Sequence, residues 1–475
     1  MSKTAAIFLF VLLMAASCQE QTSKTPGLTA LKGATIFDGN GNRIANGTLV
    51  VRDGKIEAIG DASLDIPSDA EVEDLSGKYI CPGLVDAHVH FSQTGFVDGR
   101  PDALDIRDSI NYIELQARLQ TRPEPYYEAY LRSGVTAVYD VGGFPWSIGL
   151  QESAETNLQA PHVAAAGPLL TPTSQEELET FNTPSEKQLL ELTSAQFGRN
   201  SVKMNTDIGS TGIKIWQINL QDAEFMTSLK AVAEETKTRG NKLIVHATTL
   251  DQAKAALDLG AKVMVHSVED REVDVEFLAH AKQQDVIYIS TLIVLRGYYN
   301  TYKAVLNGNF KIQDPNGVVD AHTRALLEGA AGFGRFVDTT TLRNGLPRIE
   351  QYIRYSDSIM AINLLKVFKS GIRIAAGTDA GNPGTLHGIS IFDELEAMQR
   401  VGIPAADLLV MVTRNGAAAM ERSGDLGTLE PGKEADLVVT EKDPAADIGN
   451  LRSLTHVMRA GILRPVREDF KEDKP

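Results

Sequence analysis

The sequence predicts an α/β fold: a (β/α)8 TIM barrel joined to a small β-sandwich domain that is built from both chain ends. Three observations support this fold class. Strand-like apolar runs alternate with helical stretches over about 300 residues in the middle of the chain. Short β-like runs with Gly- and Asp-rich turns occupy residues 28–82 and return after residue 425. The length of 475 residues exceeds one ordinary domain.

The barrel strands are expected at eight apolar runs, namely residues 83–88, 135–141, 162–166, 212–216, 243–246, 263–266, 286–291 and 372–378. Between them lie stretches such as residues 251–259, where apolar side chains recur every three or four positions before Gly260 ends the helix. A doubly wound sheet is the alternative fold. That fold calls for a glycine-rich phosphate loop after its first strand, where this chain has His88, Val89 and His90.

The expected organisation runs from a signal peptide to a short tail. Its segments are a lipoprotein-type signal (1–17), a tether (18–27), the first part of the β-sandwich (28–82), the barrel (83–424), the second part of the sandwich (425–468) and a tail (469–475).

The N-terminus has the features of an export signal. Lys3 precedes an apolar run from Ala5 to Ala16, which is too short to span a membrane. The small residues before Cys18 resemble a bacterial lipoprotein signal, so we expect cleavage before Cys18 and lipidation of its thiol. A plain signal peptide with a chance cysteine is the alternative. The protein is therefore expected outside the cytoplasm, in the periplasm or at the cell surface, and on a membrane only through this lipid.

Composition excludes several classes of protein. Hydrophobic residues make up 43 % and charged residues 23 % of the chain, which is typical of a folded globular protein. The net charge of -16 argues against a nucleic-acid partner. Cys81, the second of two cysteines, is expected to be a small buried hydrophobe. The sequence carries no signal for oligomerisation, so a homo-oligomer stays open.

Residues able to bind metal gather at the ends of the predicted strands. The first strand ends in His88 and His90, whose spacing directs both imidazoles to one side. His246, His266 and Asp379 end three further strands, and active sites of such barrels lie at these ends. Four of nine histidines share this placement. Taken singly, each could be a core histidine or a surface alternation, but the coincidence at equivalent strand ends favours a metal site.

Lys214 stands alone inside the apolar fourth strand. A buried lysine without a partner tends to lose its charge, and a neutral amine can react with carbon dioxide to form a carbamate. That anion could bridge two cations. The alternatives are that Lys214 extends to the barrel mouth or pairs with Asp379.

Three motifs resemble the amidohydrolase superfamily, in the branch of imidazolonepropionase and the bacterial Xaa-Pro dipeptidases (prolidases). They are Pro82–His90, the stretch Gly377–Gly381 with His387-Gly388, and Leu429–Val439. The resemblance implies that His88, His90 and Asp379 hold one metal ion and His246 and His266 another. It also implies that carbamylated Lys214 (N6-carboxylysine) bridges the two ions, which are expected to be zinc.

The same resemblance implies hydrolysis of an amide-type C–N bond in a small molecule, with Asp379 as the catalytic acid and base. An Xaa-Pro dipeptide and an N-acyl amino acid are the expected substrate types. The chain departs from the family pattern at Thr248, where histidine is frequent, and at Ser267, where glycine is frequent. These departures leave the substrate open.

Residues beyond the metal motifs are expected to bind substrate. His387 follows Asp379 on one loop and could touch substrate or cap the next helix. Residues 296–355 form a long connection that could be a lid or a structural excursion. In this connection, Arg296 and Tyr298 are expected to contact a substrate carboxylate.

Other functions stay open at this point. A phosphotriesterase- or lactonase-like esterase shares the two-metal plan with a bridging lysine. A one-metal cyclic amidohydrolase like imidazolonepropionase, or a deaminase, would not need Lys214. A scaffold that had lost catalysis would be expected to have lost ligands, and all six positions are filled here.

Overall fold

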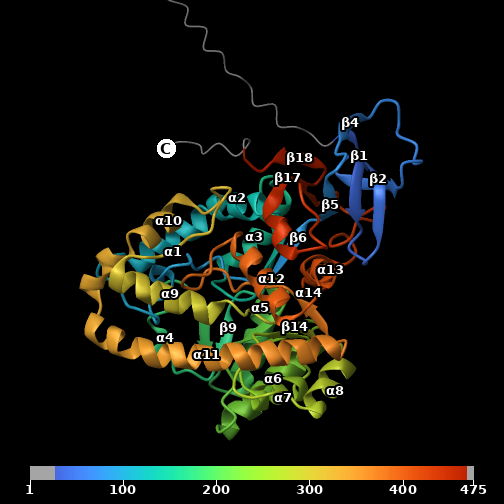
Figure 1. Ribbon diagram of the computed structural model, residues 1–475. Helices are drawn as coiled ribbons and strands as arrows, with labels where there is room; N and C mark the ends of the chain where they lie inside the picture. The colour runs from blue at the N-terminus through green and yellow to red at the C-terminus, as the bar shows by residue number, and fades with distance from the viewer. Residues whose placement is uncertain (1–26, 468–475) are drawn as a thin grey trace, which may run out of the picture.

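The computed structural model describes residues 27–467 (Figure 1). The predicted signal peptide, Cys18, all of the tether but Gly27, and the tail lie outside the described residues, so these expectations stay predictions. Among the described helices, none is both long and apolar enough to cross a membrane. Cys81 is fully buried with a free thiol, as predicted.

Each of the eight predicted apolar runs contains a strand. The strands are β6 (Leu84–Val89), β7 (Val135–Asp140), β8 (His162–Ala165), β11 (Ile213–Ile215), β12 (Leu243–His246), β13 (Val263–Val265), β14 (Ile287–Ile289) and β15 (Arg373–Ala375). Neighbouring strands are parallel throughout. Nearly all of their residues are buried, which explains why these runs are continuously apolar rather than alternating.

The eight strands belong to two sheets. One has the order β6-β7-β8, and the other has the order β10-β9-β11-β12-β13-β14-β15. Backbone hydrogen bonds connect the two sheets on both sides, for example from Thr211 to Ala165 (2.9 Å) and from Ala87 to Ala376 (3.0 Å). The doubly wound alternative does not fit, because the first strand of the series, β6, is hydrogen-bonded to the segment directly after the last strand, β15, whereas these two strands lie apart in a doubly wound sheet. Closure of the eight strands into one continuous barrel stays a prediction.

An excursion between β8 and β11 was not predicted. It contains β9 (Leu169–Thr171), α4 (Gln175–Leu178) and β10 (Leu189–Glu191). The apolar side chains of this excursion, Leu169, Leu178, Phe181 and Leu189, form a small cluster of their own, against which Trp216 packs.

Helices fill most of the remaining connections. They are α1 (Tyr112–Thr121), α2 (Glu124–Arg132), α3 (Trp146–Glu155), α5 (Ala195–Asp207), α6 (Ala223–Thr238), α7 (Leu250–Asp258), α8 (Val275–Gln283), α12 (Ser390–Val401), α13 (Ala405–Val410) and α14 (Gly416–Ala419). The local sequence explains α7 well. Thr249 and Gln252 form a capping box at its start, and Gly260 adopts a positive φ of 83° just after its end.

The long connection between β14 and β15 is largely helical. It begins with α9 (Val294–Asn307), continues with α10 (Ala321–Glu328), where a helical tract was expected, and ends in α11 (Thr339–Lys369). Figure 1 shows α11 as a long orange helix that crosses the molecule. Both α9 and α11 contribute side chains to the cavity described below.

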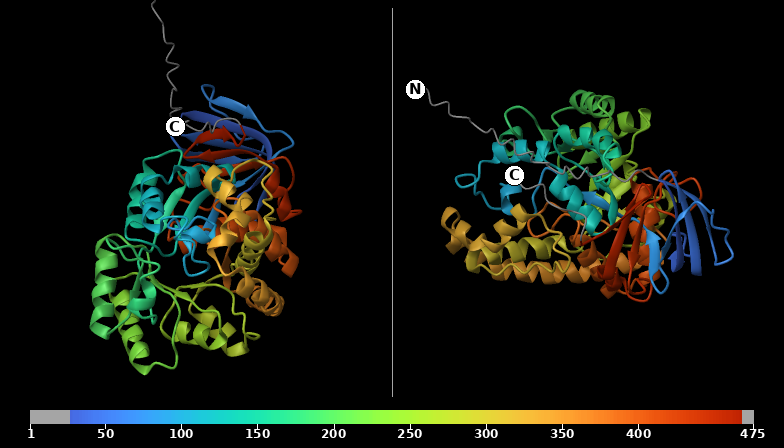
Figure 2. Two further views of the ribbon diagram at one scale, coloured as in Figure 1. Left: turned by 90° about the vertical axis from the view of Figure 1, so that its left-hand side faces the viewer. Right: turned by 90° about the horizontal axis from the view of Figure 1, so that it is seen from above.

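Strands from both chain ends build one β sheet. Its strands are β1 (Leu28–Phe37), β2 (Arg43–Arg52), β3 (Lys55–Gly60), β4 (Glu71–Asp74), β5 (Tyr79–Pro82), β16 (Leu437–Thr440), β17 (Leu454–Arg459) and β18 (Ile462–Pro465). They form one eight-stranded sheet in which β5 lies between β1 and β16. Figure 2 shows the blue N-terminal and red C-terminal strands side by side. A sandwich of two separate sheets therefore stays a prediction.

A buried ionic cluster connects this β domain to the barrel strands. His162, the first residue of β8, lies 2.8 Å from a carboxylate oxygen of Glu155 and 3.1 Å from one of Asp436. Arg459 of β17 is 2 % exposed and donates to the carbonyl of Ala160. Its guanidinium lies 4.0 Å from Asp436. We call these residues the interdomain cluster.

Candidate active site

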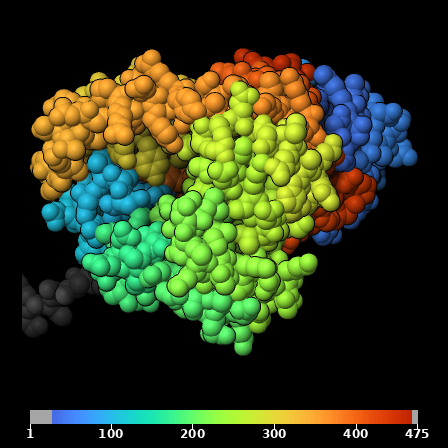
Figure 3. All heavy atoms as spheres, turned by 90° about the horizontal axis from the view of Figure 1, so that it is seen from below, coloured from blue at the N-terminus to red at the C-terminus, as the bar shows by residue number. Residues whose placement is uncertain are grey.

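The carboxyl ends of the eight parallel strands surround a cavity of about 390 Å³. Figure 3 shows the molecule hollowed between the orange helix α11, the light-blue segment that follows β6, and yellow-green residues opposite. The cavity is lined by all six residues predicted to bind metal, which are His88, His90, Lys214, His246, His266 and Asp379. The structure thus brings together residues that are up to 291 positions apart in the chain.

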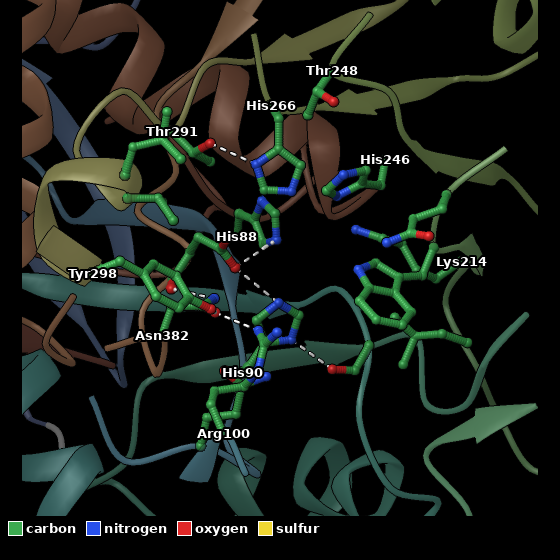
Figure 4. A pocket seen from close by; sticks show the side chains of 18 of the residues that line it. His88, His90, Arg100, Lys214, His246, Thr248, His266, Thr291, Tyr298 and Asn382 are labelled. Atoms are coloured by element: carbon green, nitrogen blue, oxygen red, sulfur yellow. Dashed lines mark hydrogen bonds and ion pairs between the residues drawn. The ribbon is translucent and has the colours of Figure 1, made fainter. Parts of the chain in front are cut away.

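Two histidines of β6 meet the carboxylate that follows β15. Nε2 of His88 lies 3.1 Å and Nε2 of His90 lies 2.9 Å from Oδ1 of Asp379 (Figure 4). The backbone N–H of Asp379 donates to the carbonyl of His88 at 2.7 Å, which fixes the loop after β15 against β6. The spacing of i and i+2 on this strand therefore directs both imidazoles to one carboxylate, as the sequence predicted.

The other two histidines lie beside this group. The ring of His266 is 5.1 Å from that of His88 and 4.3 Å from that of His246, measured between centroids. Ligand atoms of His88, His266 and Asp379 all lie within 4.8 Å of one another. Figure 4 shows His246 and Lys214 on one side of His88, and Tyr298 and Asn382 on the other.

Hydrogen bonds to the Nδ1 atoms orient the rings of two histidines, His90 and His266. Nδ1 of His90 lies 2.6 Å from the carbonyl of Gly142, and Nδ1 of His266 lies 2.8 Å from Oγ1 of Thr291. In each case the second ring nitrogen is left for a ligand, which is the usual arrangement of metal-binding histidines. His266 and Thr291 both have positive φ values, 73° and 47°, so the backbone is strained where these side chains are presented.

Asp86 holds the loop that carries Asp379. Its buried carboxylate accepts hydrogen bonds from the backbone N–H of Thr378 at 2.9 Å and from its hydroxyl at 2.6 Å. Gly377 lets the two segments approach, because a Cβ there would lie 2.8 Å from that of His88. Sequence reasoning missed the role of Asp86, although a carboxylate inside an apolar strand was a signal for it.

The donor set fits a divalent cation. Both ring nitrogens of His88 and Oδ1 of Asp379 are buried, and none makes a hydrogen bond of normal geometry to the described residues. Burial lowers the pKa of His88 to about 4 and that of His246 to about 3, so both rings are neutral near pH 7. Burial opposes ionisation of Asp379, but His88 and His90 hold its pKa well below the usual range. Neutral imidazoles with an ionised carboxylate are metal-ligand forms.

Lys214 is buried in β11 and is 2 % exposed. Burial lowers the pKa of its amine to about 7, with Asp379 and Asp140 opposing that shift. A substantial fraction of the amine is therefore neutral near pH 7, the form that reacts with carbon dioxide. Its side chain lines the cavity, and no ion pair within 4.0 Å joins it to Asp379 among the described residues.

Two predicted substrate contacts lie elsewhere. His387 does not line the cavity: its ring is buried, stacks on Tyr126 at 4.0 Å, and bonds the hydroxyl of Tyr130 and the carbonyl of Gln93. Arg296 points outward to Asp357, with N···O 2.6 Å. Residues two apart on a helix lie about 200° apart, so Arg296 and Tyr298 of α9 cannot share one face.

Tyr298 lines the cavity, with partners that the sequence did not reveal, and its contact with a substrate stays a prediction. Its hydroxyl donates to Oδ1 of Asn382 at 2.7 Å, and Arg100 donates to the same oxygen at 2.5 Å. Arg100 is also paired with Asp102 through two hydrogen bonds. Asn382 could have been suspected, because it follows Asp379 by three residues; the loop that carries Arg100 has no periodic pattern.

Fold and site together define an α/β enzyme with a candidate metal centre at the carboxyl ends of parallel strands. Comparison with known proteins agrees with this class. The Amidohydrolase family model matches residues 79–463. The chain belongs to the amidohydrolase family.

Individual relatives are distant but similar over most of their length. The chain is 24 % identical to 5'-deoxyadenosine deaminase of Methanosarcina acetivorans, over 85 % of this chain and 82 % of that protein. It is also 24 % identical to imidazolonepropionase of a Geobacillus species, over 83 % and 84 % of the two chains. A solved Xaa-Pro dipeptidase with bound methionine superposes with a TM-score of 0.70 at 20 % identity, covering 92 % of this chain and 100 % of that one. The last similarity shows the fold.

Proposed function

We propose that the protein is a metal-dependent amidohydrolase that cleaves an amide-type C–N bond of a small molecule, an Xaa-Pro dipeptide or an N-acyl amino acid. One observation carries the proposal. Four histidines and Asp379 converge on a cavity that can enclose a small molecule, and ligand atoms of His88 and Asp379 are buried without a hydrogen bond. Membership of the amidohydrolase family supports hydrolysis of carbon–nitrogen bonds.

We propose two divalent metal ions, with zinc favoured by the histidine and carboxylate ligands. His88, His90 and Asp379 would hold one ion, and His246 and His266 the other, with carbamylated Lys214 between them. The lowered pKa of Lys214 supports the carbamate. When bound, such ions lower the pKa of water and polarise a carbonyl group, so that hydroxide is available near neutral pH.

The residues of the chain supply proton transfer and binding. Asp379 is ionised and accepts the proton of the attacking water, then delivers it to the leaving nitrogen. Asp86 keeps this carboxylate in place through Thr378. In place of Arg296, the guanidinium of Arg100 is proposed to contact the substrate carboxylate, with Tyr298 and Asn382 beside it.

A one-metal enzyme of the imidazolonepropionase or deaminase type is the second candidate. The full-length similarity to both kinds of enzyme favours it. The buried Lys214 among the proposed ligands favours the two-metal enzyme, because a one-metal site has no use for a bridging anion. The two-metal esterase of the phosphotriesterase or lactonase type differs from the proposal in substrate rather than in ligands.

The experiment that tests the proposal combines metal analysis with a substrate screen. Purified protein is loaded with zinc and bicarbonate, its metal content is counted, and it is offered Xaa-Pro dipeptides, N-acyl amino acids, lactones and phosphotriesters. We expect two zinc ions per chain and turnover of an amide. Turnover of a lactone or phosphotriester alone would contradict the amide reaction, and one zinc ion per chain would favour the second candidate.

We further propose that the protein is exported and anchored through a lipid on Cys18, that its substrate-binding domain is a closed (β/α)8 barrel, and that its partners are small molecules rather than nucleic acid. Labelling with a palmitate analogue tests the anchor, and Cys18→Ser should abolish that labelling.

A further inference from the structure

One wall of the cavity is apolar and aromatic. Leu169, Phe181, Leu189 and Trp216 all line it, and the rings of Phe181 and Trp216 meet edge to face at 5.7 Å. Three of these four side chains come from the excursion between β8 and β11, whose apolar cluster holds them in place. We call these four residues the apolar wall.

The facing wall is polar and comes from other parts of the chain. It consists of Arg100, Asp102, Tyr298 and Asn382, which are joined by the hydrogen bonds described above. Among the described residues, these bonds account for three of the five N–H donors of the guanidinium, so two remain for a ligand. We call these four residues the polar wall.

Trp216 of the apolar wall and Asn382 of the polar wall lie on different sides of the candidate metal centre. Trp216 follows Lys214 by two residues, directly after the end of β11, and both side chains line the cavity. Asn382 follows Asp379 by three residues beyond β15, and its side chain donates to the backbone carbonyl of Asp379. Three strands, β12, β13 and β14, separate β11 from β15 in the sheet. Figure 4 shows Lys214 opposite Asn382 and Tyr298, with His88 and His90 between them.

We propose that the substrate is an N-acyl amino acid with a bulky apolar or aromatic acyl group, which binds against the apolar wall. This inference rests on the proposed function and gives the scissile bond a direction. Asp379 must reach the leaving nitrogen, so the amino-acid half lies on the side of Asn382 and directs its carboxylate to Arg100. The carbonyl carbon lies at the metal centre, and the acyl chain extends towards Trp216 and Phe181.

A binding experiment tests the apolar wall without turnover. The chain has two tryptophans, and Trp146 does not line the cavity, so Trp146→Phe leaves Trp216 as the only tryptophan, whose emission can be excited separately from that of the tyrosines. The change in Trp216 emission reports binding of an added acid. We expect phenylacetate, the acid released from a phenylacetyl amide, to bind with a dissociation constant at least tenfold lower than that of acetate. Phe181→Ala in the same background should remove that difference. Equal affinity for the two acids, or no response to either, would overturn the inference.

A kinetic experiment tests the direction of the substrate. N-phenylacetyl-L-proline is expected to exceed N-acetyl-L-proline in kcat/KM by about 10- to 200-fold, the range that hydrophobic pockets achieve. Phe181→Ala should reduce the ratio of the two kcat/KM values. Arg100→Met should lower kcat/KM for both substrates by the same factor and leave the ratio unchanged. Trp146→Phe is the matched aromatic control and should leave both substrates unchanged.

The two experiments separate the inference from the proposed function. A ratio near one with active enzyme would overturn the inference and leave amide hydrolysis intact. If Arg100→Met lowers the ratio of the two kcat/KM values and Phe181→Ala does not, the acyl group binds on the side of Arg100. That result would contradict the inference. If both amides are inert in zinc-loaded protein, the proposed hydrolysis of N-acyl amino acids fails, and the fluorescence titration alone decides whether the apolar wall binds an aromatic acid.

Discussion

Two buried clusters of histidine and carboxylate lie at opposite ends of the parallel strands. In the cavity, at the carboxyl ends, burial lowers the pKa of His88 to about 4. In the interdomain cluster, at the amino end of β8, burial acts in the same direction on His162, but Asp436 and Glu155 outweigh it and raise the pKa of His162.

The difference lies in how each cluster satisfies its polar atoms. Arg459 and Arg422 supply permanent cations to the interdomain cluster. Burial opposes ionisation of its carboxylates, but His162 and then Arg422 lower the pKa of Glu155 to about 2, and Arg459 and then His162 lower the pKa of Asp436. Near the ligands of the cavity lie the amine of Lys214, which is partly neutral near pH 7, and the guanidinium of Arg100, which is already paired with Asp102. The same residue types thus make a charged contact between two domains and a set of neutral ligands for a cation.

The sharpest test of this comparison removes one carboxylate from each cluster. Asp379→Asn should lower kcat/KM by about 10²- to 10⁴-fold, because the general acid–base group is lost. Asp436→Asn makes the same chemical change in the interdomain cluster and should lower thermal stability with kcat/KM nearly unchanged. Steady-state kinetics and thermal unfolding of both variants check this, and full activity in Asp379→Asn would remove its assigned role.

Two buried lysines give the next test. Lys214→Ala should reduce bound zinc from two ions to one or none, measured by elemental analysis of the purified protein. Lys242 is the matched control, since it is also buried but donates to the carbonyl of Ala419, away from the cavity. The Lys242→Ala variant should bind as many zinc ions per chain as the parent protein. Two ions in Lys214→Ala would refute the bridge.

The structural role of the interdomain cluster is tested by Arg459→Met. Removing one partner of a buried ionic cluster usually costs about 3–5 kcal/mol, because the remaining charges stay desolvated. We expect a loss at the lower end of this range, since Glu155 is 39 % exposed at its side chain. Chemical denaturation measures the loss. A variant as stable as the parent would show that the cluster contributes nothing to domain contact.

The pH dependence of stability should follow the opposite pKa shifts. A raised pKa in the folded protein means that His162 stabilises it below about pH 6.5 and that this contribution is lost as the pH rises through the raised value. Glu155, with its pKa lowered to about 2, stabilises the protein above about pH 4.5 and loses this contribution as the pH falls towards 2.

The stability difference between the parent protein and His162→Gln should therefore be largest between about pH 4.5 and 6.5 and smaller on both sides. The cavity histidines have lowered pKa values, so their contribution to stability changes with pH in the opposite direction to that of His162. This contribution is the same in both proteins and cancels when their stabilities are compared at each pH. Denaturation curves at five pH values check this. A difference that grows steadily with pH would contradict the raised pKa.

The smallest effect is expected from Arg296→Ala. Its exposed pair with Asp357 should contribute little, and kcat/KM should stay within about twofold. Arg100→Met should instead raise KM about tenfold, the loss expected for a hydrogen bond to a charged group. A large effect of Arg296→Ala on KM would restore the prediction made from the sequence.

The sequence predicts the metal centre because its members come at the ends of apolar runs. His88, His246, His266 and Asp379 each stand where a strand stops, and parallel strands bring such ends together. The apolar wall and Arg100 could not be predicted in this way, because they lie in irregular connections whose approach to the cavity depends on tertiary packing. The outward direction of Arg296 depends on the phase of α9, which was not expected to be a helix.

The position of β5 between β1 and β16 has a consequence for how the chain is made. Cys81 and Ile80 pair with residues about 350 positions later, on β16. At a synthesis rate of about 5–20 residues per second, the free edge of β5 waits roughly 20 to 70 s for its partner. A nascent chain thus carries an open strand edge throughout barrel synthesis, and unpaired edges recruit other strands. Truncation before Leu437 should therefore produce aggregation, even though every residue predicted to bind metal has already been synthesised.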